Sequence, residues 1–298
     1  MDYTEIDKIA EKFLYWFQIS YKKELCDRAL STMTEEGCWE DIDYTGEKNP
    51  HWRVVEHLTR LNHMAYNGEI DGVIRGLEYW YQRERKDSNW WWNDIGFPME
   101  LAECGVALRR VLAPELKTKL INSFNSDVSD YWTGTNRAWL AQNVIVRGIL
   151  EEDADLIEKG RKILEDNIFI SKTGEEGIQY DFAFAQHGRQ LYNNGYGISL
   201  IVDSMKWIDV FAGTALAFPQ EKIDILCNLL LDGNGRMGFC EVPDFNSIGR
   251  DIVRSFKQRD VRMRNYLDII PVMKKYSSRV DELDKFERFI NGDRKSVV

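Results

Sequence analysis

The chain has 298 residues, and 39 Lys and Arg against 49 Asp and Glu give a formal net charge of −10. A hydrophobic share of 44% is enough to bury a full core, so the composition excludes a disordered chain and indicates one large domain or two ordinary ones. The acidic balance argues against a nucleic-acid-binding protein, whose affinity rests on Lys and Arg that neutralise phosphates.

The first segment predicts an amphipathic helix, because apolar residues recur at i, i+3 and i+4 spacing: Ile6, Ile9, Ala10, Phe13, Leu14 and Phe17. Acidic residues lie among them and no cationic stretch comes first, so this start is not a secretion signal as written. No apolar run in the chain approaches the roughly 20 residues needed to span a bilayer, so we expect no membrane partner.

Helical spacing dominates the rest of the chain. Similar apolar stripes cover 139–149 and 156–164, and further helices are predicted at about 52–66, 69–84, 97–111, 115–126, 197–213, 219–231, 262–275 and 280–291. Pro98, Pro114 and Pro219 fall where helix starts tolerate proline. The sequence contains no strand followed by a glycine-rich loop and a helix, which is the order that a nucleotide-binding unit requires. We therefore expect an all-α fold of about 11–13 helices, paired as a solenoid or closed ring.

The cysteines and histidines show no metal-binding pattern. The five cysteines are far apart and have no zinc-like spacing, which indicates reduced, structural thiols and no metal or other cofactor. Three of the four histidines, His51, His57 and His63, are expected on helix surfaces.

Three segments interrupt the helical pattern, at 86–96, 129–137 and 173–197, and all are rich in Asn, Gly, Trp and Tyr. The first contains Trp90, Trp91 and Trp92 in succession, which cannot all face one core. At least one is expected to be exposed or in a cleft, where an indole ring stacks on a sugar; a structural aromatic cluster is the alternative.

The second and third segments carry polar residues with two possible roles. Residues 133–137, Thr-Gly-Thr-Asn-Arg, precede a helix and would serve either as its cap or as a binding site. His187 lies in a Gly/Asn-rich loop nine residues before Tyr196, so both side chains are able to project into one pocket. A purely structural histidine is the alternative.

A fourth segment, 244–254, contains Arg250 and Arg254, and one helical turn would present both on the same face. Two such guanidinium groups suit carboxylates or sulfates, whereas a solvated basic edge is the alternative.

Taken together, these motifs resemble polysaccharide lyase family 8, which contains the chondroitin AC, hyaluronate and xanthan lyases. The motifs occur in the family's order: NWWWNDIG, TGTNR, EGIQYDFAFAQHG, YNNGYG and DFNSIGRDIVR. The resemblance runs from about Trp52 to Arg254 and is greatest to the chondroitin AC branch. It implies an incomplete (α/α) toroid over 1–298, with a long cleft for an anionic polysaccharide.

The resemblance also implies roles for individual residues. Asn136 matches the residue that binds the uronate carboxylate, His187 and Tyr196 match the catalytic pair, and Arg250 matches an arginine of the closing motif. Expected substrate-binding residues are Asn89, Trp90, Trp91, Arg137, Gln186 and Arg254.

The sequence departs from the family at several points. Arg189 stands where family members usually have Pro, and Trp139 stands where they often have an acidic residue. Residues 251–253 stand where the family usually has small residues. The family continues into β-sandwich domains, one of which supplies a Glu to the site, and we expect these to be absent from a chain that stops at Val298. Family members are normally secreted or periplasmic, although no signal peptide begins this sequence. No feature indicates an oligomeric state.

The resemblance implies β-elimination, in which Asn136 and His187 neutralise the carboxylate and Tyr196 serves as base and then acid, helped by Arg250 or His187. Two other functions stay open. A glycoside hydrolase acting on uronides would need a carboxyl pair, for which Asp94 and Asp181 are the candidates. A non-catalytic module would bind anionic polysaccharide without cleaving it.

Overall fold

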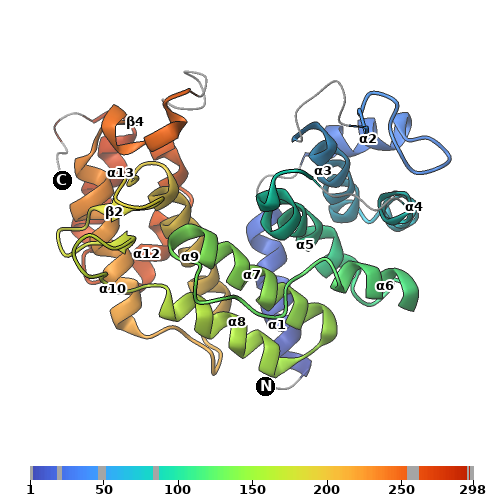
Figure 1. Cartoon of the computed structure of the whole chain (residues 1–298), viewed down its shortest axis with the longest axis horizontal. Coiled ribbons are helices and arrows are strands. Elements are labelled where there is room, and N and C mark those ends of the chain that lie inside the picture. The colour runs from blue at the N-terminus through green and yellow to red at the C-terminus, as the bar shows by residue number, and fades with distance from the viewer. Residues whose placement is uncertain are drawn as a thin grey trace. The chain divides into compact units, whose positions relative to one another are not determined.

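The computed structural model describes residues 3–18, 22–45, 52–82, 87–253, 262–293 and 295 (Figure 1). By their internal contacts the residues form two compact units: Met1–Val128 with Trp139–Gly160, and Ser129–Ala138 with Arg161–Val298. The chain crosses between the units three times: in the loop at Val128–Ser129, within helix α7 (Gly134–Glu151) and within helix α8 (Ala154–Asp166). The expectation of a single domain over 1–298 stays a prediction.

Every regular element described in the first unit is a helix. Besides its shares of α7 and α8 it contains α1 (Tyr3–Gln18), α2 (Lys23–Thr32), α3 (Trp52–Tyr66), α4 (Ile70–Tyr81), the π-helical turn η1 (Trp92–Gly96), α5 (Phe97–Leu108) and α6 (Pro114–Ile121). Helix α3 packs against α2, α4 and α5. The apolar stripe predicted for the first segment is buried in α1, where Ile9 and Ala10 are fully covered.

The second unit combines helices with two short hairpins. Its further α-helices are α9 (Tyr196–Phe211), α10 (Gln220–Asn228), α12 (Ile270–Tyr276) and α13 (Val280–Ile290). The hairpins pair β1 (Gly177–Ile178) with β2 (Phe184–Ala185) and β3 (Gly238–Phe239) with β4 (Val242–Pro243), both antiparallel. Short helical turns fill the remainder: η2 (Leu229–Gly233), η3 (Asn234–Arg236), η4 (Phe245–Ser247), η5 (Gly249–Val253) and η6 (Arg262–Tyr266).

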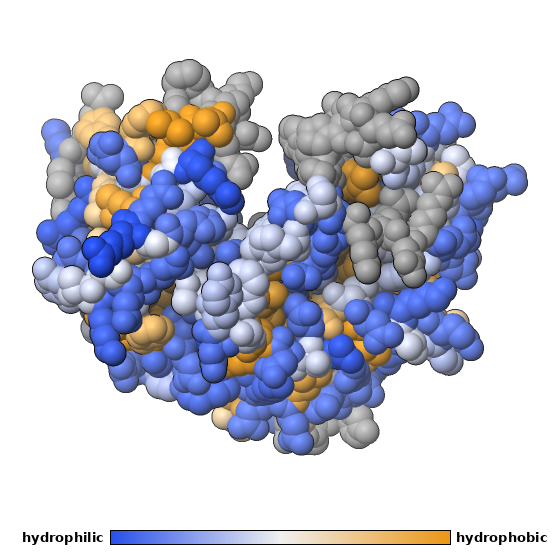
Figure 2. Space-filling model, in the orientation of Figure 1, coloured by the Kyte–Doolittle hydropathy of each residue, from blue (hydrophilic) through white to orange (hydrophobic). Residues whose placement is uncertain are grey.

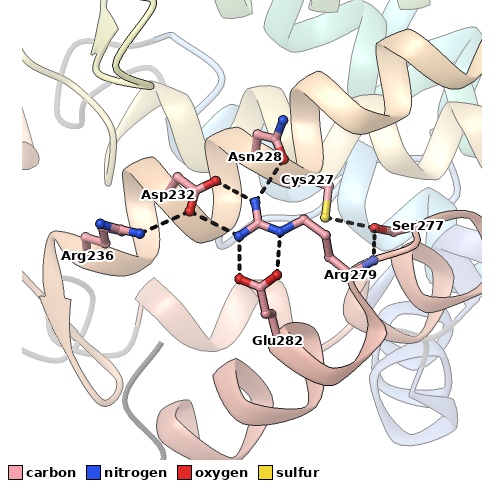
Figure 3. Close-up of polar contacts among 7 residues, drawn as sticks. All are labelled: Cys227, Asn228, Asp232, Arg236, Ser277, Arg279 and Glu282. Carbon is pink, nitrogen blue, oxygen red and sulfur yellow. Dashed lines mark hydrogen bonds and ion pairs between the residues drawn. The ribbon is translucent and has the colours of Figure 1, made fainter.

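An arginine joins three of these elements (Figure 3). The guanidinium of Arg279 donates to Asn228 Oδ1 at 2.8 Å, to both carboxylate oxygens of Asp232 and to those of Glu282. Arg236 also pairs with Asp232, at 3.2 Å. The end of α10 and the turn η2 are thereby tied to the start of α13.

The described residues form twelve α-helices, within the expected number, and the all-α class is confirmed. Pro98 and Pro114 lie in the first turns of α5 and α6, and Pro219 is the N-cap of α10, as predicted. Helix α2 was not predicted. No described helix has the length and apolar character that crossing a membrane demands. Hydrophilic side chains cover most of the surface visible in Figure 2.

The expected surface position of His57 is wrong, because its side chain is fully buried. Nε2 lies 3.0 Å from the Gly76 carbonyl, which only accepts, so Nε2 donates this bond, and Nδ1 lies 3.0 Å from the Tyr44 hydroxyl. His51 lies outside the described residues, and His63 is half-buried on α3.

Candidate active site

Tyr196 is the first residue of α9 and lies within a cluster of aromatic rings. Its ring centroid is 4.9 Å from that of Tyr192 and 5.2 Å from that of His187, both edge-on. The tight approach depends on Gly195, where a Cβ atom would stand 2.3 Å from the Tyr192 ring. Tyr192 is fully buried, and burial raises the pKa of its phenol, so it forms a fixed, neutral support for Tyr196.

Arg250 reaches the same cluster from η5. Its Nη2 donates to the phenolic oxygen of Tyr196 at 2.7 Å, and its backbone N–H donates to the Tyr192 hydroxyl at 2.9 Å. The preceding Gly249 has φ +55°, and a Cβ there would lie 2.3 Å from the Tyr192 ring. Glycine is therefore required for this arginine to approach the two tyrosines.

His187 occupies an exposed turn that follows β2. Its φ of +58° is unusual for a residue with a side chain, and Gly188 after it has φ +81°. The turn is closed by a bond from the Gln186 N–H to the Gln190 carbonyl at 3.1 Å. The imidazole ring is thereby directed toward Tyr196.

The start of α7 supplies the fourth group. Gly134 opens the helix with φ +54°, and Asn136 lies in its first turn. Thr135 joins this turn to the other elements: its N–H donates to Gln186 Oε1 at 3.1 Å, and its hydroxyl donates to the Tyr196 carbonyl at 2.7 Å. Asn136 is 5% exposed, and its Oδ1 is a buried acceptor with no partner among the described residues. A buried polar atom of this kind is available to a ligand.

These bonds bring the starts of α7 and α9, the turn after β2 and η5 to one place in the second unit. The place offers a phenol held by a guanidinium, an imidazole beside it and a buried amide on the adjoining helix. Such a set suits removal of a proton next to a carboxylate. Among the described residues, no cluster of three or more His, Cys, Asp or Glu side chains is placed to hold a metal ion.

The comparisons with known proteins fit this arrangement. Residues 18–285 match polysaccharide lyase family 8, N terminal alpha-helical domain. The chain belongs to this family. Chondroitinase-AC of Pedobacter heparinus is 28% identical over 247 residues, 78% of this chain and 35% of that protein. Xanthan lyase of a Bacillus species is 32% identical over 212 residues, which cover 59% of this chain and 22% of that enzyme.

A solved structure of chondroitinase AC lyase superposes with a TM-score of 0.86 at 22% identity, covering 97% of this chain and 45% of that chain. This likeness confirms the expected fold class, the (α/α) toroid of the family's helical domain. The present chain spans about a third of the length of the curated chondroitinase it matches. The roles expected for individual residues stay predictions.

In the structure His187 and Arg250 contact Tyr196, and Asn136 follows Thr135, whose hydroxyl bonds to the Tyr196 carbonyl. The binding roles expected of the other residues stay predictions, and their positions are as follows. Gln186 is 1% exposed, and its side-chain oxygen accepts the Thr135 N–H. Arg137 donates to the Trp132 carbonyl and pairs with Asp130 at 3.1 Å. Arg254 lies outside the described residues.

The predicted aromatic group belongs to the first unit. Trp90 is 41% exposed, which confirms that at least one of the three tryptophans reaches the surface. Trp91 packs edge-on against Trp92 and against Trp139, with centroids 5.0 and 5.6 Å apart. The Asn89 side chain accepts the Trp91 N–H at 3.1 Å and so caps this helical segment.

A buried asparagine network was missed from the sequence. Asn193 accepts the Phe184 N–H at 2.7 Å and donates to the Phe182 carbonyl and to Asn234 Oδ1. Asn194 donates to Ser247 Oγ and to the Met237 carbonyl. The network ties the loop before Tyr196 to η3 and η4. The only signal in the sequence is the Asn-Asn-Gly run at 193–195.

Proposed function

We propose that the chain is the helical catalytic domain of a lyase that cleaves a uronate-containing anionic polysaccharide by β-elimination. One observation carries the proposal: Arg250 Nη2 donates to the Tyr196 phenolic oxygen at 2.7 Å, while the His187 ring lies 5.2 Å from the Tyr196 ring. An arginine that donates to a phenol favours the ionised form, which is the form a base needs.

The chemical difficulty is the weak acidity of C5–H beside the uronate carboxylate. Removing that proton spreads negative charge onto the carboxylate oxygens, so groups that neutralise these oxygens lower the barrier. Asn136 and His187 are the residues we assign to this task. The side-chain NH2 of Asn136 is the end that donates to carboxylate oxygens, whereas its Oδ1, which has no partner among the described residues, accepts only from a ligand group that donates, such as a sugar hydroxyl.

The proton moves through one residue. The Tyr196 phenolate takes the C5 proton, the C4–O4 bond breaks as the C4–C5 double bond forms, and the same phenol returns its proton to the leaving O4. The product carries a 4,5-unsaturated uronate at its new non-reducing end. Base and acid catalysis by one positioned group contributes roughly 10²–10⁴-fold.

The relatives support the substrate class. Chondroitinase-AC, xanthan lyase and hyaluronate lyase are the names of curated proteins that are 28–32% identical to parts of this chain. We therefore propose that the present chain cleaves an anionic polysaccharide by β-elimination. Experiment is needed to identify the polymer.

The test uses the whole chain with a panel of uronate polysaccharides and follows the ultraviolet absorbance of the unsaturated product. We expect Tyr196→Phe and His187→Ala to reduce the rate by about 10²–10⁴-fold. Tyr180→Phe is the matched control, because Tyr180 lies in the same motif region and is 74% exposed. Equal rates for Tyr196→Phe and Tyr180→Phe would contradict the assignment.

The same experiment separates the other two functions. New reducing ends without a rise in absorbance, lost in Asp94→Asn with Asp181→Asn, would indicate a hydrolase. Binding without any product would indicate a non-catalytic module. The Asp181 carboxylate accepts the Ala183 N–H at 3.1 Å, which gives it a role in a local turn.

A further inference from the structure

The carboxylate of Glu176 joins two segments of the site. Glu176 immediately precedes β1 and is half-buried. One of its oxygens accepts the backbone N–H of Gly188, and the other accepts the Thr133 hydroxyl at 2.5 Å. Gly188 directly follows His187, and Thr133 lies three residues before Asn136. A single side chain thus holds the neighbours of both groups that we assign to the substrate carboxylate.

The turn held by Glu176 needs support. His187 and Gly188 are both left-handed, and a left-handed residue with a side chain persists only where its surroundings fix it. Residues 187–190 are all exposed, so burial does not supply that support. The bonds that hold the turn are the Gln186–Gln190 backbone bond, a 3.3 Å bond from Arg189 Nε to the Gly174 carbonyl, and the bond from the Gly188 N–H to the Glu176 carboxylate.

Thr133, the second residue that is hydrogen-bonded to the Glu176 carboxylate, also adjoins a residue with a left-handed backbone conformation. Thr133 precedes Gly134, whose φ of +54° sets the direction in which α7 begins. An ionised acceptor makes a stronger hydrogen bond than a neutral one, so a carboxylate suits a bridge between two exposed segments. The distance between the His187 turn and the start of α7 therefore depends on Glu176.

We propose that Glu176 is a positioning residue that holds the His187 imidazole at the place where it meets the substrate carboxylate. This inference rests on the proposed lyase function. Glu176 acts through the Gly188 N–H and the Thr133 hydroxyl, and it contacts neither substrate nor Tyr196. Without it, the His187 turn relaxes and the imidazole leaves its place beside Tyr196.

The kinetic test compares Glu176→Ala and Glu176→Gln on a cleaved polysaccharide. We expect Glu176→Ala to lower kcat by about 10²-fold with little change in KM, because a small displacement of a catalytic group has an effect of that size. Glu176→Gln keeps an oxygen for the Gly188 N–H, and the Thr133 hydroxyl is able to accept from the new amide, so most activity should return. Glu175→Ala is the matched control, since Glu175 is an exposed neighbouring carboxylate.

A double-mutant cycle distinguishes positioning from general damage. In a His187→Ala background, Glu176→Ala should cause a much smaller further loss, because the imidazole it positions is gone and only its bond to Thr133 is left to act. The proposal is overturned if Glu176→Ala lowers kcat equally in both backgrounds, if it matches Glu175→Ala, or if Glu176→Gln falls as far as Glu176→Ala.

A measurement without substrate keeps this inference separate from the proposed function. The His187 ring proton, assigned by comparison with His187→Gln, should show an NMR shift displaced by the Tyr192 and Tyr196 rings. Glu176→Ala should move it toward the value of a solvent-exposed histidine, and an unmoved signal overturns the proposal. A signal that Glu176→Ala moves, in a protein that cleaves nothing, would reject the lyase function and keep the positioning role.

Discussion

At the scale of single residues, two buried asparagines of the second unit have opposite relations to their surroundings. Asn193 uses its amide fully, with one bond accepted and two donated inside the protein. Asn136 has a buried Oδ1 without a partner among the described residues. An unsatisfied buried acceptor destabilises the fold, so its retention at the start of α7 is best explained by a ligand.

This contrast gives the first prediction. Asn136→Ala should change the free energy of unfolding by no more than about 1 kcal/mol, because the lost packing is offset by removal of an unsatisfied acceptor. The same variant should lose roughly 10²–10³-fold in lyase rate, the usual effect of deleting a group that stabilises developing charge. Denaturant unfolding and the absorbance assay measure the two effects.

Asn193→Ala is the matched control for this prediction. It leaves the Phe184 N–H and the Phe182 carbonyl without their partner, and should lower the free energy of unfolding by about 2–4 kcal/mol. Equal destabilisation in the two variants would show that Asn136 is an ordinary structural amide.

A second prediction at this scale concerns Gly249. A Cβ at this position would lie 2.3 Å from the ring of Tyr192, which is fully buried and unable to move aside. Gly249→Ala should therefore displace Arg250 from Tyr196 and reduce kcat by about 10²-fold.

Gly213→Ala is its control, since Gly213 also has a left-handed φ, +78°, and no atom lies within 4 Å of the place that an added Cβ would take. Both variants incur the backbone penalty of about 1–2 kcal/mol, and only Gly249→Ala should lose activity. Loss of activity in both would mean that backbone strain, and not the clash with Tyr192, is responsible.

At the scale of the elements, the helices were largely predictable and their connections were not. The pattern at 52–66 predicts the helix that the structure has at those positions, because apolar side chains recur every three or four residues. His57 lies on the same face as Leu61 and Met64, four and seven residues later, so its burial follows from that period. Helix α2 escaped prediction because only Cys26 and Ala29 are buried in it.

The motifs that make up the site were predictable from the sequence, but the hydrogen bonds that align them in space were not. The sequence places Asn136, His187, Tyr196 and Arg250 in four polar segments, and the family resemblance brings these segments together. The bonds that align them join distant residues: Thr135 to Gln186, and Arg250 to Tyr196. Such pairs have no periodicity along the chain, so no local pattern reveals them.

The Arg279 network gives a prediction for the elements it joins. Hydrogen bonds from Arg279 hold the pKa of Asp232 below its ordinary 3.8 and that of Glu282 below its ordinary 4.5. The folded state therefore binds fewer protons than the unfolded state as the pH approaches these values. The stabilisation is fully present above about pH 5 and is lost as the pH falls through the lowered pKa values.

Arg279→Met should consequently lower the free energy of unfolding by roughly 1–3 kcal/mol at neutral pH, and by progressively less below about pH 4. The difference between the two proteins, measured by denaturant unfolding at several pH values, isolates this network from the other carboxylates. Arg236→Met is the control, because its 64% exposed side chain makes a surface pair worth under about 1 kcal/mol. A difference that stays constant from pH 7 to pH 3 would contradict the electrostatic explanation.

At the scale of the whole molecule, the net charge of −10 opposes the proposed anionic substrate. Binding must then depend on positive groups close to the site, where they act at short range against a repulsion spread over the surface. Arg250 and Arg189 are exposed in the segments that carry or adjoin the catalytic groups. Screening by salt weakens interactions of this exposed kind, so affinity for a uronate polysaccharide should fall as ionic strength rises.

Arg189→Gln tests whether position or total charge governs this binding. In a Tyr196→Phe background, which prevents cleavage, we expect about fivefold weaker binding at low salt, equivalent to about 1 kcal/mol for one exposed ionic contact. The loss should shrink at high salt, where the contact is screened. Arg236→Gln makes the same change in net charge, and Arg236 already pairs with Asp232. If both variants weaken binding equally, total charge governs the affinity; a loss confined to Arg189→Gln places the substrate beside the His187 turn.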